Sequence, residues 1–64
     1  MMQDVPETMP ESRRQEIFHA LVEVQDQGSD VPQSRQLIAA RFGLSEEQVR
    51  RIEREGLDAQ WPPL

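Results

Sequence analysis

Three arginines are the residues of this 64-residue chain best suited to a chemical task. Arg50, Arg51 and Arg54 lie in a segment with helical periodicity, and residues three or four apart share one face of a helix. A guanidinium group can donate hydrogen bonds to a phosphate or to both major-groove acceptors of guanine. Alternatively, Glu47 pairs with Arg50 and Arg51, three and four residues on, and the face is simply solvated.

The residues around these arginines have the pattern of two short helices joined by a tight turn. Gly43 permits the positive φ of such a turn, and Ala39 is small enough for two helices to cross over it. Val49 and Ile52 are spaced to face inward from the second helix. The order of these four residues is typical of a helix-turn-helix, whose second helix enters the major groove of DNA. A helical hairpin of any other function would share much of this pattern.

Ser45 and Gln48 have the spacing of a capping box, in which two residues three apart form reciprocal hydrogen bonds. They mark the leading end of the second helix, where a helix-turn-helix comes closest to the bases. Glu46 and Glu47 follow in the first turn, where negative charge suits the positive end of the helix dipole.

The longest helix is expected over residues 9–27. Thr8 and Glu11 have capping-box spacing, and Gly28 supplies the left-handed conformation that ends a helix. Residues 1–8 show no periodicity and are interpreted as a flexible arm. The apolar residues of this helix form one stripe on a charged rod. They are Ile17, Phe18, Leu21, Val22 and Val24.

Two shorter helices are expected over residues 32–42 and 46–55. Asp30 is the expected cap of the first, and Gly56 is the expected end of the second. The further side chains expected in the core are Leu37, Ile38, Phe42 and Leu44. Residues 9–57 are therefore predicted to form an all-α, three-helix helix-turn-helix domain.

Residues 58–64 form an apolar tail whose prolines cannot continue a helix. Trp61 in this tail has two interpretations. It folds back to close the small core, which we favour, or it docks with Leu64 into a partner protein, as aromatic anchors do.

The composition argues against an enzyme, a metal site and a membrane protein. The chain has no cysteine and a single histidine, His19, without partners at ligand spacing. We expect His19 to be partly buried and structural, and we expect no catalytic residue, metal or cofactor. No apolar run approaches the roughly 20 residues of a membrane span, so the protein is expected to be cytoplasmic.

Charge is distributed unevenly along the chain. The net charge is −5, yet residues 31–54 carry five arginines and three acids. Phosphate neutralisation supplies most of the nonspecific affinity for DNA, so an acidic monomer is expected to bind DNA weakly at physiological salt. A homodimer on adjacent half-sites would bind more tightly.

The stretch over residues 38–57 resembles the promoter-reading helix-turn-helix in the fourth region of bacterial housekeeping sigma factors. The resemblance rests on Ile38, on the run Arg41-Phe42-Gly43-Leu44-Ser45, and on Glu47, Val49-Arg50, Ile52-Glu53 and Leu57. In that family the second helix reads the upstream promoter element, and the domain also docks on the flap of RNA polymerase.

The resemblance implies a role for individual residues of the second helix. Glu47 and Arg51 would face the bases, and Ser45 and Arg50 would lie near the DNA backbone. Members of the family typically have an arginine that contacts DNA at the position of Glu46.

Two functions are therefore predicted. The first is a sigma-like, DNA-binding transcription regulator or accessory factor whose partner is double-stranded DNA. The second is a protein-interaction module of helix-turn-helix shape that docks on RNA polymerase or another transcription protein without binding DNA. The residues expected to contact DNA are Ser45, Glu47, Gln48, Arg50, Arg51 and Arg54.

Overall fold

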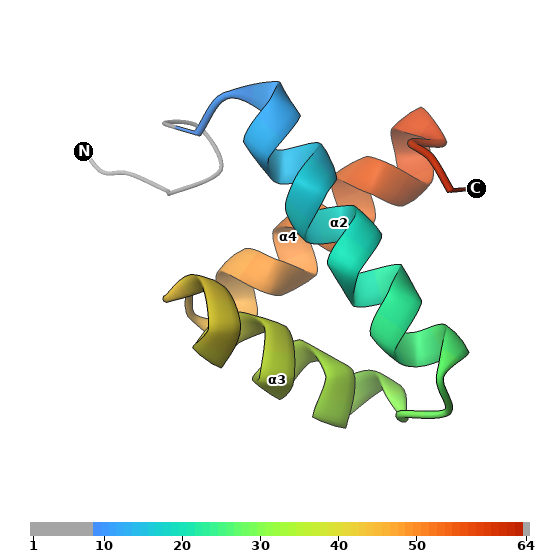
Figure 1. Ribbon diagram of the computed structural model, residues 1–64. Helices are drawn as coiled ribbons and strands as arrows, with labels where there is room; N and C mark the ends of the chain where they lie inside the picture. The colour runs from blue at the N-terminus through green and yellow to red at the C-terminus, as the bar shows by residue number, and fades with distance from the viewer. Residues whose placement is uncertain (1–8, 64) are drawn as a thin grey trace.

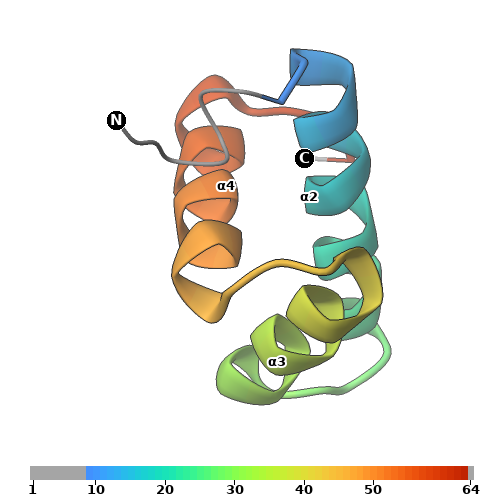
Figure 2. The same cartoon turned by 90° about the vertical axis from the view of Figure 1, so that its left-hand side faces the viewer.

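The computed structural model describes residues 9–63, which form three α-helices and, within that range, no strand (Figure 1). Helix α2 covers Glu11–Asp26, α3 covers Val31–Phe42 and α4 covers Glu46–Ala59. Each helix packs against the other two, with α3 lying across one end of the α2 and α4 pair (Figure 2). The fold class is therefore all-α, as predicted.

The starts of α3 and α4 are fixed by side-chain caps. The backbone N–H of Gln33 donates to the Asp30 carboxylate at 2.8 Å. At α4, the N–H of Gln48 donates to the Ser45 hydroxyl at 3.1 Å, and the Gln48 side chain accepts from the Ser45 N–H at 2.9 Å. These bonds satisfy amide groups that a helix start leaves without partners, so both helices begin where the sequence pattern places them.

The turn between α3 and α4 depends on Gly43, which has a φ of 70°. This left-handed conformation is accessible to glycine without a steric cost. The N–H of Leu44 then donates to the carbonyl of Ala39 at 2.8 Å, which folds the chain back at the end of α3. Leu44 packs against the core from this position.

Helix α2 is two residues shorter at its start than the sequence suggests. It begins at Glu11 after Pro10, and no side chain caps it. The predicted cap, Thr8, lies outside the described residues. The helix ends at Asp26, and Gly28 follows with a φ of 107°.

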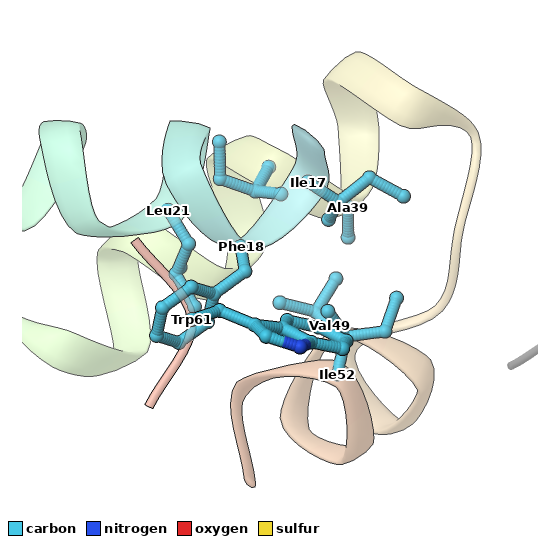
Figure 3. Packing of buried hydrophobic residues seen from close by; sticks show 8 residues of the cluster. Ile17, Phe18, Leu21, Ala39, Val49, Ile52 and Trp61 are labelled. Carbon is cyan, nitrogen blue, oxygen red and sulfur yellow. The ribbon is translucent and has the colours of Figure 1, made fainter. Parts of the chain in front are cut away.

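The core lies between the three helices (Figure 3). Its members are Ile17, Phe18, Leu21, Ile38, Ala39, Val49, Ile52 and Trp61.

Two expectations about burial were wrong. Leu37 is 44% exposed, because Ile38 and Ala39 point inward and leave their neighbour on the outer side of α3. His19 is exposed on the solvent side of α2 rather than partly buried. Phe42 is half-buried, with the Arg13 guanidinium 5.0 Å from its ring centre.

Gly56 does not end the last helix, as the sequence suggested, but lies inside it. Helix α4 continues to Ala59, and the ring of Phe18 from α2 packs directly on the helix at Gly56. A Cβ atom added at Gly56 would lie 2.3 Å from the ring. The absence of a side chain is therefore what allows α2 to approach α4 so closely.

The tail after α4 folds back onto the contact between Phe18 and Gly56. Gln60 adopts a left-handed φ of 55°, and the N–H of Trp61 donates to the carbonyl of Gly56 at 3.0 Å. This turn carries the Trp61 ring to the edge of Phe18, with 6.0 Å between ring centres and an interplanar angle of 77°. Trp61 is 6% exposed, so it belongs to the core.

We predict that Gly56→Ala destabilises the fold, although alanine ordinarily favours a helix by about 0.5–1 kcal/mol over glycine. The new methyl group would force the Phe18 ring out of place, and overpacking of this kind costs roughly 1–3 kcal/mol. Urea unfolding followed by circular dichroism measures the change. Leu57→Ala, at an exposed position next along the same helix, is the control and should change stability little. A Gly56→Ala variant at least as stable as the parent would contradict this account of the packing.

Candidate nucleic-acid interface

Helix α4 presents its arginines to solvent because its apolar residues all lie on the opposite side. Val49, Ile52 and Gly56 are buried against the other helices. Arg50, Arg51 and Arg54 are exposed, as the helical spacing predicted. Three guanidinium groups thus stand on one solvent-facing surface, which we call the arginine face.

The leading end of α4 carries the other residues expected at DNA. Ser45 is exposed and Gln48 is half-buried, and both are engaged in the capping box. Glu46 and Glu47 are exposed in the first turn. Within residues 9–63 no ion pair involves Glu46, whereas Glu47 forms two.

Glu47 pairs with two of the three arginines. One carboxylate oxygen lies 3.3 Å from Nη1 of Arg50, and the other lies 3.5 Å from Nε of Arg51. All three side chains are at least half exposed, so each pair contributes only a few tenths of a kcal/mol. Arg54 makes no ion pair with any residue of the described range. These contacts agree with the solvated alternative for the free protein, and they are weak enough to exchange for a phosphate.

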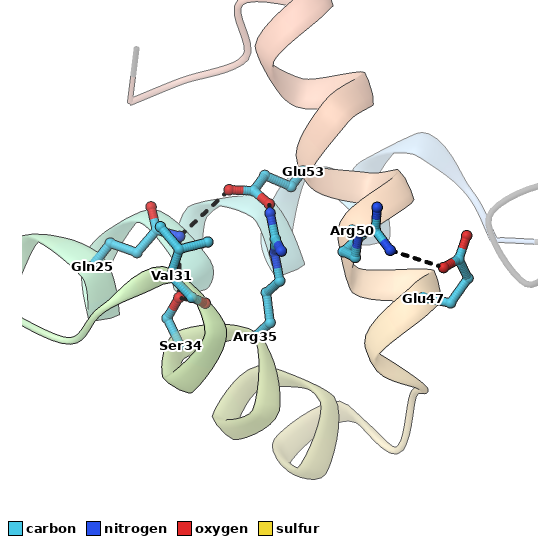
Figure 4. A network of polar contacts seen from close by, with 7 residues as sticks. All are labelled: Gln25, Val31, Ser34, Arg35, Glu47, Arg50 and Glu53. Atoms are coloured by element: carbon cyan, nitrogen blue, oxygen red, sulfur yellow. Dashed lines mark hydrogen bonds and ion pairs between the residues drawn. The ribbon is translucent and has the colours of Figure 1, made fainter.

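The remaining two glutamates of α4 point sideways, toward the neighbouring helices. Nε and Nη2 of Arg35, on α3, approach one oxygen of Glu53 at 3.0 and 2.8 Å (Figure 4). The side-chain amide of Gln25, on α2, donates to the other oxygen at 3.5 Å and to the Ser34 hydroxyl at 3.1 Å. Ser34 is fully buried and donates to the carbonyl of Val31 at 2.8 Å. This network joins all three helices around Glu53.

Glu55 points to the opposite side and pairs with Arg14 of α2. Nε and Nη2 of Arg14 each donate to a separate carboxylate oxygen at 2.8 Å, and Nη1 donates to the carbonyl of Met9. The hydrogen bond with Glu55 raises the pKa of Arg14 above its ordinary value, and the negative charges of Glu55 and Glu11 add to this. Since arginine is already protonated at working pH, the raised pKa leaves the charge of Arg14 unchanged there.

Sequence reasoning did not find the partners in these lateral pairs. The partner of Arg14 is 41 residues away in the chain. Arg35 and Glu53 are 18 residues apart and were not expected to meet. No periodicity within one helix carries such information, because the pairing depends on how the helices cross.

An open groove of about 480 Å³ runs beside the arginine face between α3 and α4. It is lined by four arginines, three acidic residues and Leu57. Arg35 is the arginine that α3 contributes, and the others belong to α4. Of the two residues predicted to contact a partner protein, Trp61 is buried. Leu64 lies outside the described residues.

No protein-family model, curated protein or solved structure matches the chain. Within residues 9–63, no group of three or more histidine or acidic side chains is placed to hold a metal ion. None of the three helices has the length and apolarity needed to cross a membrane.

We predict that Arg14→Gln lowers the free energy of unfolding by roughly 1–3 kcal/mol, since it removes charge-assisted hydrogen bonds to a partly buried carboxylate. Glu16→Gln is the control, because it removes the more exposed pair with Arg13 within α2 and leaves Arg13 over the Phe42 ring. That change should stay within about 0.5 kcal/mol. Thermal unfolding of both variants checks the difference, and equal losses would show that the pair with Glu55 has no special role.

Proposed function

We propose that this protein binds double-stranded DNA as a helix-turn-helix transcription regulator or accessory factor, with α4 in the major groove. The observation that carries the proposal is how the charges of α4 are divided. Glu53 and Glu55 are neutralised by arginines of the other helices, whereas Arg50, Arg51 and Arg54 face solvent. The face that would meet DNA is therefore far less acidic than the chain as a whole.

The form of the helix pair supports the same function. The major groove, about 12 Å wide, admits one α-helix. Helix α4 has 14 residues and begins in a capping box, and it follows a tight turn at Gly43, as the second helix of a helix-turn-helix does. Its buried side is fixed by Val49 and Ile52, so the arginine face cannot turn inward.

The resemblance to the fourth region of sigma factors supports a more specific assignment. In this proposal Glu47 and Arg51 face the bases, and Ser45 and Arg50 lie near the backbone. Gln48 and Arg54 complete the contact surface on either side of them. Glu46 stands where the sigma family has an arginine, so the sequence that this helix prefers differs from that of a housekeeping sigma factor.

Binding to a random-sequence duplex, followed by fluorescence anisotropy as salt is raised, tests the proposal. We expect measurable binding at 50 mM salt that weakens steeply with salt, because phosphate contacts release counterions. The double variant Arg50→Glu with Arg54→Glu should abolish binding. For a matched comparison, Arg54→Glu should weaken binding more than Arg13→Glu, which makes the same change in net charge on α2. A folded protein that binds no duplex at 50 mM salt would refute the proposal.

Glu47 provides a second test, because it competes with phosphate for Arg50 and Arg51. We predict that Glu47→Gln tightens binding to a random-sequence duplex severalfold, and more than Glu46→Gln does. Both changes remove one negative charge from the first turn of α4, but Glu46 holds no arginine in the described range. Anisotropy titrations at one salt concentration compare them. Equal effects would mean that the ion pairs do not restrain the arginines.

A second candidate function is a module that docks on RNA polymerase or another transcription protein. The outward side of α2 favours it, since Glu16, Glu23 and Asp26 are all exposed there. The buried position of Trp61 argues against the tail as its anchor. This candidate replaces the first if the folded chain fails to bind duplex DNA in the anisotropy test.

A further inference from the structure

The groove between α3 and α4 adds a fourth arginine to the three of the arginine face. Arg35 enters it from α3, and Figure 4 shows its side chain reaching toward α4 on the same side as Arg50. Four arginines and three acids line the groove, so its lining carries one surplus positive charge. The protein as a whole has a net charge of −5, so the groove differs from it in the sign of its charge.

Arg35 is held in place before any ligand arrives. Its Nε and Nη2 atoms bind one oxygen of Glu53, and Gln25 holds the other oxygen. Its side chain is 28% exposed and lines the groove. No residue of the described range accepts a hydrogen bond from its Nη1 atom. An arginine has five N–H donors, and those not used by Glu53 remain for an acceptor in the groove.

We propose that Arg35 is a phosphate-binding residue, and that the groove it shares with Arg50 and Arg54 holds the backbone of the DNA strand beside α4. This inference rests on the proposed DNA-binding function and adds a contact from a second helix. Arginine suits the site because its planar fork matches the oxygens of a phosphate. A contact of this kind fixes the register of α4 on the duplex and carries no sequence information itself.

The form of the groove favours a backbone phosphate over a free nucleotide. Its lining includes no aromatic side chain on which a base could stack, and the groove is open along the helix. It also continues directly into the arginine face through Arg50 and Arg54, which line both. With α4 in the major groove of DNA, the backbone of one bordering strand would lie in this protein groove.

The test uses a variant that keeps the net charge of the protein. Arg35→Gln combined with Glu53→Gln removes both members of the ion pair, so the overall charge stays at −5. We expect the slope of log affinity against log salt to fall by about 0.9, the value for one phosphate contact, with affinity on the order of tenfold lower at 50 mM salt. Arg35→Lys should keep the slope, because it keeps the positive charge.

The control is Arg13→Gln combined with Glu16→Gln, which removes a pair on α2 that does not line the groove and should leave the slope unchanged. Circular dichroism verifies that each variant is folded. If the Arg35 and Glu53 double variant does not fold, the Nε–H resonances of the wild-type arginines replace it. Adding duplex should then shift the resonance of Arg35 and leave that of Arg13 in place.

The outcomes separate this inference from the proposed function. A wild-type protein that binds no duplex refutes the proposed function, and with it the backbone contact. Wild-type binding with the same slope in the Arg35 and Glu53 double variant refutes only the contact, and shows that Arg35 serves the fold alone. The last measurement is the binding of ATP, at the same ionic strength, to the wild-type protein and to the Arg35 variants. Binding of ATP that depends on Arg35, without binding of duplex, would assign the groove to a free nucleotide and overturn the inference.

Discussion

The contact between the Phe18 ring and the backbone of α4 at Gly56 determines how the rest of the molecule is arranged. Because Gly56 has no side chain, the ring lies on the helix itself, and Trp61 closes over its edge. Rotation of α4 about its axis would replace Gly56 by a side chain that the ring cannot accommodate. The same contact therefore fixes the inward side of α4 and, as a consequence, the residues that face solvent.

The polar contacts of α4 follow from the orientation of the helix about its axis, which the contact between Phe18 and Gly56 fixes. With Val49 and Ile52 directed inward, the neighbouring Glu53 and Glu55 fall on the two flanks of the helix. Each flank meets an arginine from a different helix, so the pairs oppose rotation of α4 in either direction. The flanking charges are satisfied within the fold, and on the arginine face Glu47 restrains Arg50 and Arg51.

Local features of the fold were predictable from the sequence, and features that depend on helix crossing were not. The caps at Asp30 and Ser45 and the turn at Gly43 each depend on residues within five positions of one another. Gly56 was read as a helix end because glycine often has that role, and nothing nearby in the chain reveals that Phe18 needs the space.

At the candidate site, too, residues within one helix were predictable and contacts between helices were not. Helical spacing placed Arg50, Arg51 and Arg54 on one exposed side, since that side follows from the positions of Val49 and Ile52. Arg35 could not be assigned to the site in this way. Its place in the groove depends on the angle between α3 and α4, which is set by packing.

The acidity of the chain bears less on the proposed DNA binding than its net charge suggests, because the charges are separated in space. Glu16, Glu23 and Asp26 are exposed on α2, and none of them lines the groove that the arginines share. Helix α4, about 10 Å across, stands between α2 and the arginine face, because its buried side meets Phe18 of α2. At physiological ionic strength the Debye length is about 8 Å, so the acids of α2 are largely screened at the arginine face. The charges that decide the encounter with a phosphate are then those within a few ångströms of it: the arginines of α4, Arg35, and the glutamates that pair with them. At much lower ionic strength the screening length exceeds the thickness of the protein, and the acidic side of α2 opposes the approach of DNA as well.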